Sequence, residues 1–443
     1  MVVLRQQYPK AGRADMIRLL LREKNMKVSR AVVMKWFDQW EPDLVRERKH
    51  RRLRRKRFWA AGAADVWCVD QHDKWKKYGL GLHTGVDPFI GQIKWLRVWW
   101  TNRNPRLIFR YYLDTVRRLR YTSLVIQSDP GSENFCLAKG HTYIRCALDP
   151  DLEGTIQHRW KREKKNIPPE TLWSNLRRRF TPGFEDILDA PLRHPELRYD
   201  RFDPLQYNVF KWVFIPWIQA ELDGWADGYN NTRKRYQKDK VLPQGGSPDD
   251  MEEYPDEYGF VNFKINIDPN GSYLTEAEQL WAPPDHEVFE LVPKDFGRVI
   301  QHVYDCLGAP PVTRDNVWTV YMDLLEQLER DNLEGLNLAG YNEDEDNYTV
   351  GEEDADMMAH LARDLEDLQP LRDDTGECYM GGVNGGLGAE GDVWDENVLD
   401  AYAEFSSDEE DDANYDGRVS SDDELDAQEV QAEVLAFSDE DEE

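Results

Sequence analysis

The spacing of apolar residues divides the chain into stretches with different periods. Residues 11–42 repeat apolar positions every three or four residues, which predicts two short helices with a turn at 24–28 and Ser29 as an N-cap. The segments ADVWCVD, GLGLHTGVD and GQIKWLRVWW then read as strands, a helical stretch follows at 106–120, and the apolar run SLVIQ reads as a further strand. Strands followed by alternating helix and strand predict an α/β domain with a mixed sheet.

Further helices are expected downstream. One carries Leu172, Trp173, Leu176 and Phe180 on a single side. The segment 206–231 is apolar nearly all round, with Pro216 as an expected kink, so it is either buried or an oligomer interface. Two amphipathic helices, at 295–306 and 316–332, lie in a stretch that yields no chemical motif.

Charge is distributed unevenly along the 443 residues. Residues 1–60 hold 18 Lys and Arg against 6 Asp and Glu, whereas residues 341–443 hold 3 against 37. The net charge of −29 therefore averages a basic head, a nearly balanced middle and an acidic tail. The tail has few large aliphatic residues, so we expect it to be disordered. Acid-rich sequences surround five tail serines that an acid-directed kinase would favour, namely Ser406, Ser407, Ser420, Ser421 and Ser438.

The basic head has the features of a DNA-binding segment. The two predicted helices match the proportions of a helix-turn-helix, whose second helix would offer Arg30 and Lys35 to the bases; an ordinary helical hairpin is the alternative. The run RERKHRRLRRKRF follows and suits phosphate contact or nuclear import, so we expect a nuclear protein. The phosphate contacts are expected at Arg51, Arg52, Arg54, Arg55 and Lys56.

Cysteine usage and hydropathy exclude several classes of protein. The five cysteines are scattered without a Cys-x-x-Cys pair, which argues against a disulfide framework and a structural zinc site. No apolar run approaches the roughly 18 residues that span a bilayer, so we expect a soluble protein that does not engage membranes.

Three acidic residues stand at the ends of predicted elements. Asp70 closes the first strand, Asp129 follows SLVIQS, and Glu170 opens a helix after two prolines. Carboxylates at the ends of neighbouring strands, faced by one from a helix, can bind two Mg²⁺ or Mn²⁺ ions about 4 Å apart. Such a pair of metals suits phosphodiester chemistry.

The residues around these acids resemble the retroviral integrase and DDE transposase core. The strands from VWCVDQHD to WLRVWW, the turn SDPGSEN, and Asn166 and Trp173 at their offsets from Glu170 carry the resemblance. It extends over residues 1–265 and is closest to integrase-core proteins of basidiomycete fungi. It implies a ribonuclease H-like mixed sheet with flanking helices, preceded by the helix-turn-helix-like segment and followed by the acidic tail.

The resemblance also implies roles for individual residues. Asp70, Asp129 and Glu170 would be the catalytic metal ligands, and Glu133 and Asn134 would shape the turn beside the second of them. DNA would lie near Arg177, Arg178 and Arg179. Asp129 and Glu170 are 41 positions apart, wider than the roughly thirty-five of retroviral integrases, so Glu163 is a rival third ligand. His158 could point toward the site, although a surface or capping role is expected.

Four domains and two functions follow from these patterns. The domains are 1–60 for DNA binding, 61–250 for the integrase-like core, 251–340 for a mainly helical extension, and 341–443 for the tail. The leading function is metal-dependent DNA nicking and strand transfer by a homo-oligomer. A nuclease that cuts without joining is a weaker reading. The alternative from another class is a catalytically silent, domesticated DNA-binding protein whose acidic tail competes with DNA for the basic surface.

Overall fold

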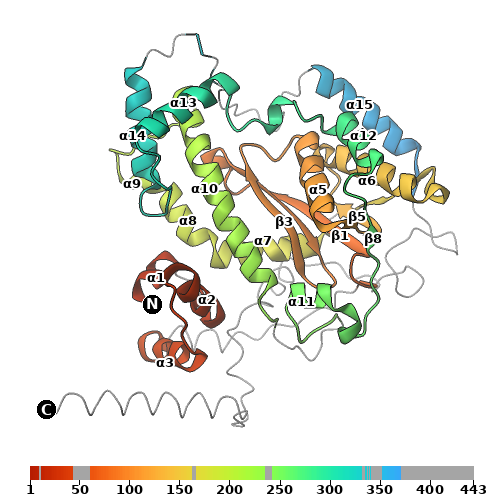
Figure 1. The fold of residues 1–443 in the computed structure, drawn as a ribbon, viewed down its shortest axis with the longest axis horizontal. Coiled ribbons are helices and arrows are strands. Elements are labelled where there is room, and N and C mark those ends of the chain that lie inside the picture. Colours follow the sequence, from red (N-terminus) through yellow and green to blue (C-terminus); the bar gives the residue numbers. More distant parts are fainter. Residues whose placement is uncertain are drawn as a thin grey trace. The chain divides into compact units, whose positions relative to one another are not determined.

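The computed structural model describes residues 1–8, 11–42, 60–161, 166–234, 242–331, 335–336, 338, 340 and 352–370. Figure 1 shows the helices and strands of the chain. The described residues divide into two compact units. The first contains the described residues of Met1–Arg55 together with Ser174–Glu185, and the second contains those of Lys56–Trp173 and Asp186–Leu399. The helices α7 (Ile167–Arg179) and α8 (Thr181–Leu188) each contribute residues to both. The four predicted domain boundaries stay a prediction.

The first unit confirms the two helices expected near the N-terminus and adds one before them. Its N-terminal helices are α1 (Val2–Gln7), α2 (Arg13–Lys24) and α3 (Arg30–Trp40). Asn25 ends α2 in the left-handed conformation, and the hydroxyl of Ser29 accepts a hydrogen bond from the backbone N–H of Val32, as an N-cap does. Buried apolar residues, among them Leu4, Met16 and Phe37, form its core.

The second unit is built on a mixed five-stranded sheet. Its strands run in the order β3-β2-β1-β5-β7, and their bounds are β1 (Val66–His72), β2 (Gly81–Asp87), β3 (Gln92–Trp99), β5 (Val125–Ser128) and β7 (His158–Trp160). The first three strands form an antiparallel meander, while β5 and β7 run parallel to β1. This sheet with its flanking helices is the ribonuclease H-like α/β fold that the resemblance implies.

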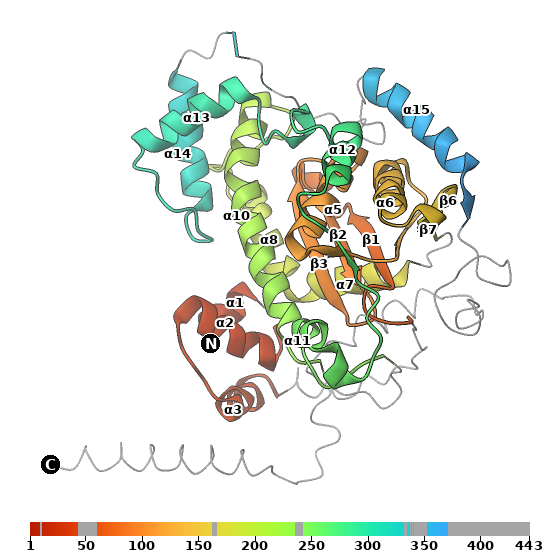
Figure 2. The same ribbon diagram turned by 45° about the vertical axis from the view of Figure 1, so that its right-hand side comes forward.

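The two faces of the sheet differ in what covers them. Trp67 and Val69 on β1 and Ile126 on β5 belong to one apolar core with residues of α5 (Pro105–Leu119) and α6 (Phe135–Leu148). Helix α5 spans almost the residues that the sequence predicts. Because side chains alternate along a strand, Asp70 points to the opposite face from Trp67 and Val69. The ribbon in Figure 2 shows α5 and α6 beside the strands of the sheet.

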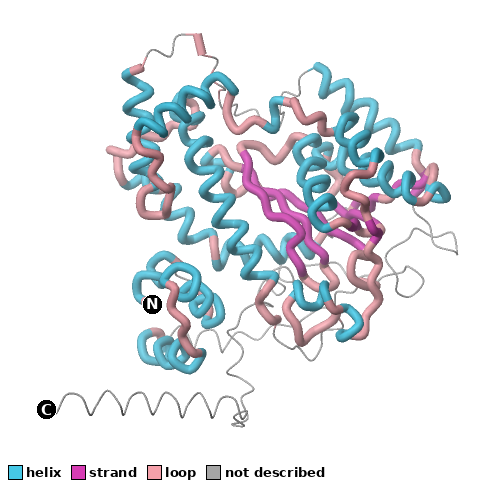
Figure 3. Tube along the Cα trace, viewed as in Figure 1, coloured by secondary structure: helices cyan, strands magenta, loops and turns pink. Residues whose placement is uncertain are grey.

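The chain after the sheet is mostly helical, as Figure 3 shows by the helices around the central strands. The long helix α10 (Pro204–Asn230) contains Pro216 and packs against β3. The two helices predicted beyond it are confirmed as α13 (Lys294–Cys306) and α14 (Val317–Arg330). Shorter elements were not predicted: α9 (Ala190–Arg193), α11 (Pro248–Glu253), α12 (Ser272–Trp281), and the ladder of β4 (Tyr121–Thr122) with β8 (Ile265–Asn266).

One part of the acidic tail differs from the expectation of disorder. Residues 352–370 form α15 (Glu352–Asp367) and the short strand β9 (Gln369–Pro370), which pairs with β6 (Thr155–Ile156). Helix α15 packs on α6, and Leu361 and Leu365 are buried there, four residues apart on one helix face. A few apolar residues at helical spacing suffice to dock an acidic segment. The tail serines and the rest of the tail lie outside the described residues.

None of the helices that the structure describes combines the length and the apolarity needed to cross a bilayer.

Candidate active site

The strand register brings the first two acids to the same level of the sheet. Cys68 on β1 is paired with Gln127 on the parallel neighbour β5. Asp70 lies two residues beyond Cys68, and Asp129 lies two residues beyond Gln127. Adjacent parallel strands are about 4.8 Å apart, so the backbone positions of Asp70 and Asp129 are neighbours where β5 ends. The predicted first and second ligands are therefore neighbours.

The third acid comes from the helix that faces these strand ends. Glu170 lies in the first turn of α7, directly after the two prolines of that turn. One turn later, the indole nitrogen of Trp173 donates a hydrogen bond to Oδ2 of Asp70 over 2.9 Å. The ring of Trp173 is also stacked on His72, with centroids 4.9 Å apart. Helix α7 thus reaches β1 at the residue that carries the first carboxylate.

The charges of both other acids act on Asp70. Burial raises the pKa of Asp70 well above its ordinary value, and the negative charge of Asp129 raises it further. The hydrogen bond from Trp173 lowers it, while the charge of Glu170 raises it. For Asp129, burial raises the pKa first and the charge of Glu133 second. Desolvation and like charge both oppose the ionisation of Asp70 and Asp129, so a positive charge bound nearby would stabilise their ionised forms.

The turn after Asp129 is fastened by side-chain hydrogen bonds. Oε1 of Glu133 accepts from the amide of Gln71 at 2.7 Å and from Asn134 at 3.2 Å, and Asn134 also donates to the carbonyl of Asp129 at 3.3 Å. Gly131 allows this packing, because a Cβ there would lie 2.1 Å from Oε1 of Glu133. These contacts agree with the role that the resemblance implies for Glu133 and Asn134.

The donor set suits a hard divalent cation. All three acids offer carboxylate oxygens, the ligands that Mg²⁺ and Mn²⁺ prefer. Oδ1 of Asp129 is buried and, among the described residues, has no hydrogen-bond partner, which a bound cation would supply. The described residues contain no group of three or more His, Cys, Asp or Glu close enough to hold a metal ion as they stand.

His158 differs from the expectation of a surface or capping role. It lies on β7 next to β5 and is 4% exposed, and its Nε2 lies 2.9 Å from the hydroxyl of Ser128. Burial lowers the pKa of His158 to about 3, so the imidazole is neutral at physiological pH. The prediction was wrong because the strand β7 is only three residues long and leaves little periodicity to read.

The residues predicted to contact DNA differ in how exposed they are. Arg30 and Lys35 are exposed on α3, and Arg177 is exposed on α7. Arg178 is partly buried, and Arg179 forms an ion pair with Asp15 of α2 over 3.2 Å. The basic residues Arg51, Arg52, Arg54, Arg55 and Lys56 lie outside the described residues, as does Glu163, the rival third ligand. The DNA contacts stay a prediction.

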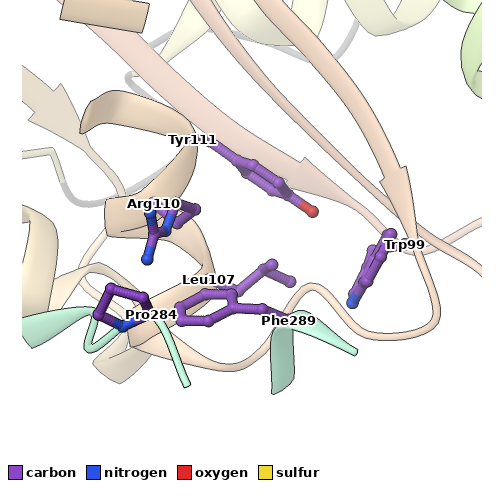
Figure 4. Close-up of a pocket in the computed structure, with 6 residues that line it drawn as sticks. All are labelled: Trp99, Leu107, Arg110, Tyr111, Pro284 and Phe289. Carbon is purple, nitrogen blue, oxygen red and sulfur yellow. The ribbon is translucent and has the colours of Figure 1, made fainter. Parts of the chain in front are cut away.

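A pocket of about 320 Å³ lies elsewhere in the second unit. Figure 4 shows its lining residues, which come from β3, α5 and the segment near residue 284: Trp99, Leu107, Arg110, Tyr111, Pro284 and Phe289. The guanidinium of Arg110 is already engaged by Glu278 and by the carbonyl of Ala282. The six described residues that line it share none with the acidic site.

Comparison with known families agrees with this geometry. Residues 58–244 match the family model described as "Integrase core domain". No curated protein matches the chain. Residues 58–244 are therefore similar to an integrase core, and the sheet, Asp70, Asp129 and Glu170 all lie within them. Such cores bind DNA, generally use divalent metals and, as a class, carry out polynucleotidyl transfer.

Proposed function

We propose that this protein is a DNA strand-transfer enzyme that binds two Mg²⁺ or Mn²⁺ ions through Asp70, Asp129 and Glu170. The observation that carries the proposal is the strand register, which brings Asp70 and Asp129 to one level of the sheet; the charges of Asp129 and Glu170 both act on Asp70.

The chain's own residues would hold and orient the reacting groups. When bound, the two metals would supply an activated attacking oxygen and a stabilised leaving oxygen. Asp70 and Asp129 provide oxygens from two neighbouring strands, while Glu170 provides one from the facing helix. Trp173 fixes the orientation of the Asp70 carboxylate through its hydrogen bond. These four residues are the chain's contribution to the proposed metal site.

DNA binding, location and assembly belong to the same proposal. The exposed Arg30 and Lys35 on α3 support base contact by the first unit. The excess of basic residues before residue 60 supports phosphate contact and a nuclear location. We also propose that several copies act together, because strand transfer joins DNA ends that must be held at once. Phosphorylation of the tail serines by an acid-directed kinase would make the acidic tail more negative.

The test is Mg²⁺- or Mn²⁺-dependent nicking and strand transfer on supercoiled plasmid with the full chain. The Asp129→Asn variant should lose both products, whereas Asp323→Asn, which changes an exposed acid on α14, should retain them. Nicks without joined products would favour a nuclease. Loss of neither product in Asp129→Asn would place the chemistry elsewhere.

A catalytically silent DNA-binding protein is the second candidate, favoured by the charge separation between the basic head and the acidic tail. It predicts that wild-type protein binds DNA but gives no product with either metal. Removing the tail should then strengthen DNA binding at low salt, because the tail competes for the same positive surface.

A further inference from the structure

Two hydrogen bonds tie the start of α7 to consecutive residues of β1. Nδ2 of Asn166, which directly precedes the helix, donates to the carbonyl of Val69 at 2.8 Å. The indole of Trp173 donates to the carboxylate of the next residue, Asp70, at 2.9 Å. Asn166 lies four positions before Glu170 and Trp173 lies three positions after it. The two contacts therefore hold the helix about one turn to either side of the third acid.

The Asn166 contact is the end of a chain of hydrogen bonds with one fixed direction. Arg159 on β7 donates to Oε1 of Gln127 from Nε at 3.1 Å and from its terminal nitrogen at 2.7 Å. Nε2 of Gln127 donates to Oδ1 of Asn166 at 3.0 Å. Since a guanidinium can only donate, Oε1 of Gln127 must accept. The NH₂ group of Gln127 is then left to donate to Asn166, and that of Asn166 to donate to Val69. Arg159 thereby sets which end of Asn166 faces Val69.

Burial makes this chain of hydrogen bonds costly to break. Asn166 and Val69 are fully buried, and Gln127 is 4% exposed, so water cannot replace a lost partner. An unpaired buried amide or carbonyl keeps the full cost of its lost contact with water. The chain of hydrogen bonds crosses three strands, from β7 through β5 to β1, and ends at Val69, one residue before Asp70. It therefore fixes the position of the start of α7 relative to the strands that carry Asp70 and Asp129.

The Trp173 contact acts on the carboxylate itself. An indole N–H can only donate, so it holds Oδ2 of Asp70 as an acceptor and fixes the rotation of that carboxylate. The stack of Trp173 on His72 fixes the indole plane in turn. In metal sites, groups that hydrogen-bond the ligands orient them, and losing such a group typically lowers metal affinity by about 10- to 100-fold.

We propose that Asn166 and Trp173 are positioning residues that clamp α7 to β1 at two points, so that Glu170 faces Asp70 and the two bind a divalent cation together. The inference rests on the proposed metal site and adds the residues that build it. Neither residue touches the cation or DNA in this scheme. Their effect is on cation affinity, which can be measured without DNA.

The experiment measures Mn²⁺ binding to the full chain by titration calorimetry or by the loss of free Mn²⁺ signal in electron paramagnetic resonance. The Trp173→Phe variant keeps a ring to stack on His72 but has no N–H for Asp70. Asn166→Leu keeps the approximate size but cannot donate to Val69. Asp129→Asn identifies the binding that belongs to the acidic site. Trp318→Phe is the matched control, because its indole also donates one hydrogen bond, to the carbonyl of Ile187 at 2.7 Å.

We expect the dissociation constant for Mn²⁺ to rise about ten-fold or more in Trp173→Phe and Asn166→Leu, and to be unchanged in Trp318→Phe. Unfolding temperatures are measured in parallel, and Trp173→Phe decides the matter if Asn166→Leu fails to fold. Wild-type affinity in a folded Trp173→Phe variant would overturn the clamp, and so would a wild-type chain with no Mn²⁺ binding dependent on Asp129. Weakened binding in a chain that processes no DNA would support the clamp while contradicting the proposed strand-transfer function.

Discussion

The indole nitrogen of Trp173 and Oδ2 of Asp70 are 2.9 Å apart, although the two residues are 103 positions apart in the chain. This contact gives a physical reason for the offset of three residues between Glu170 and Trp173. On a helix, positions three apart lie on one face, so an indole that reaches β1 brings Glu170 toward the same strand. The pair of Glu170 and Trp173 therefore serves to dock α7 on β1 as well as to supply a metal ligand.

Gly140 should resist substitution by alanine, although alanine favours helices. A Cβ at this position of α6 would lie 2.3 Å from two ring carbons of Phe109 on α5, which is fully buried. Overpacking of this kind should lower the free energy of unfolding by about 1–3 kcal/mol. The same change at Gly297 on α13 meets no atom closer than 3.5 Å and should stabilise by about 0.5–1 kcal/mol. Denaturant titrations of both variants check the opposite signs; equal effects would show that the α5–α6 contact is looser.

Lys211 should make stability depend on pH. Burial on α10 lowers its pKa to about 7, and its ammonium lies over the rings of Tyr207 and Trp100, at 4.7 and 5.5 Å. Below pH 7 the amine is protonated in both states, and folding bears the full cost of burying the charge. Between pH 7 and about 10.4 only the unfolded chain keeps the proton, so the free energy of unfolding rises with pH.

The check is a comparison with Lys211→Met, which has a similar shape and no charge. The variant should be more stable than wild type at pH 6, by roughly 3–5 kcal/mol if the whole shift is expressed. The difference should shrink steadily toward pH 10. A difference that does not change between pH 6 and pH 10 would mean that Lys211 keeps its ordinary pKa.

The sheet and the first two acids follow from local sequence pattern. Strand alternation gives β1 to β3, and a strand-terminal Asp is visible at Asp70 and at Asp129. The clamp could not be predicted in this way, because Gln127, Arg159 and Asn166 meet only when strands far apart in sequence are paired. The packing of 174–185 with the N-terminal helices, and of α15 on α6, are likewise contacts between distant segments.

Arg177 and Arg179 should contribute differently to DNA binding, although both were expected to lie near DNA. Arg177 is exposed, whereas Arg179 is 16% exposed in its side chain and ion-paired with the buried carboxylate of Asp15. Arg177→Gln should weaken DNA binding and lower the slope of log affinity against log salt by about 1. Arg179→Gln should instead lower the unfolding temperature, because Asp15 loses a partner while staying buried. Fluorescence anisotropy at several salt concentrations and thermal melts separate the two; a reduced salt slope for Arg179→Gln would place it on DNA.

Glu170, and not Glu163, should prove to be the third acid of the site. The charge of Glu170 acts on Asp70, and Glu170 lies between the two residues that bind α7 to β1. Glu170→Gln keeps the size and hydrogen-bonding reach of the side chain but removes the charge, so metal-dependent nicking should fall at least about 100-fold. Glu163→Gln is the natural counterpart, and nicking should stay within about two-fold of wild type. Both variants are assayed at saturating and at limiting Mn²⁺, because a lost ligand costs more when the cation is scarce. The reverse result, with Glu163→Gln inactive and Glu170→Gln active, would assign the third ligand to the shorter spacing and would remove the reason for α7 to be held on β1 at all.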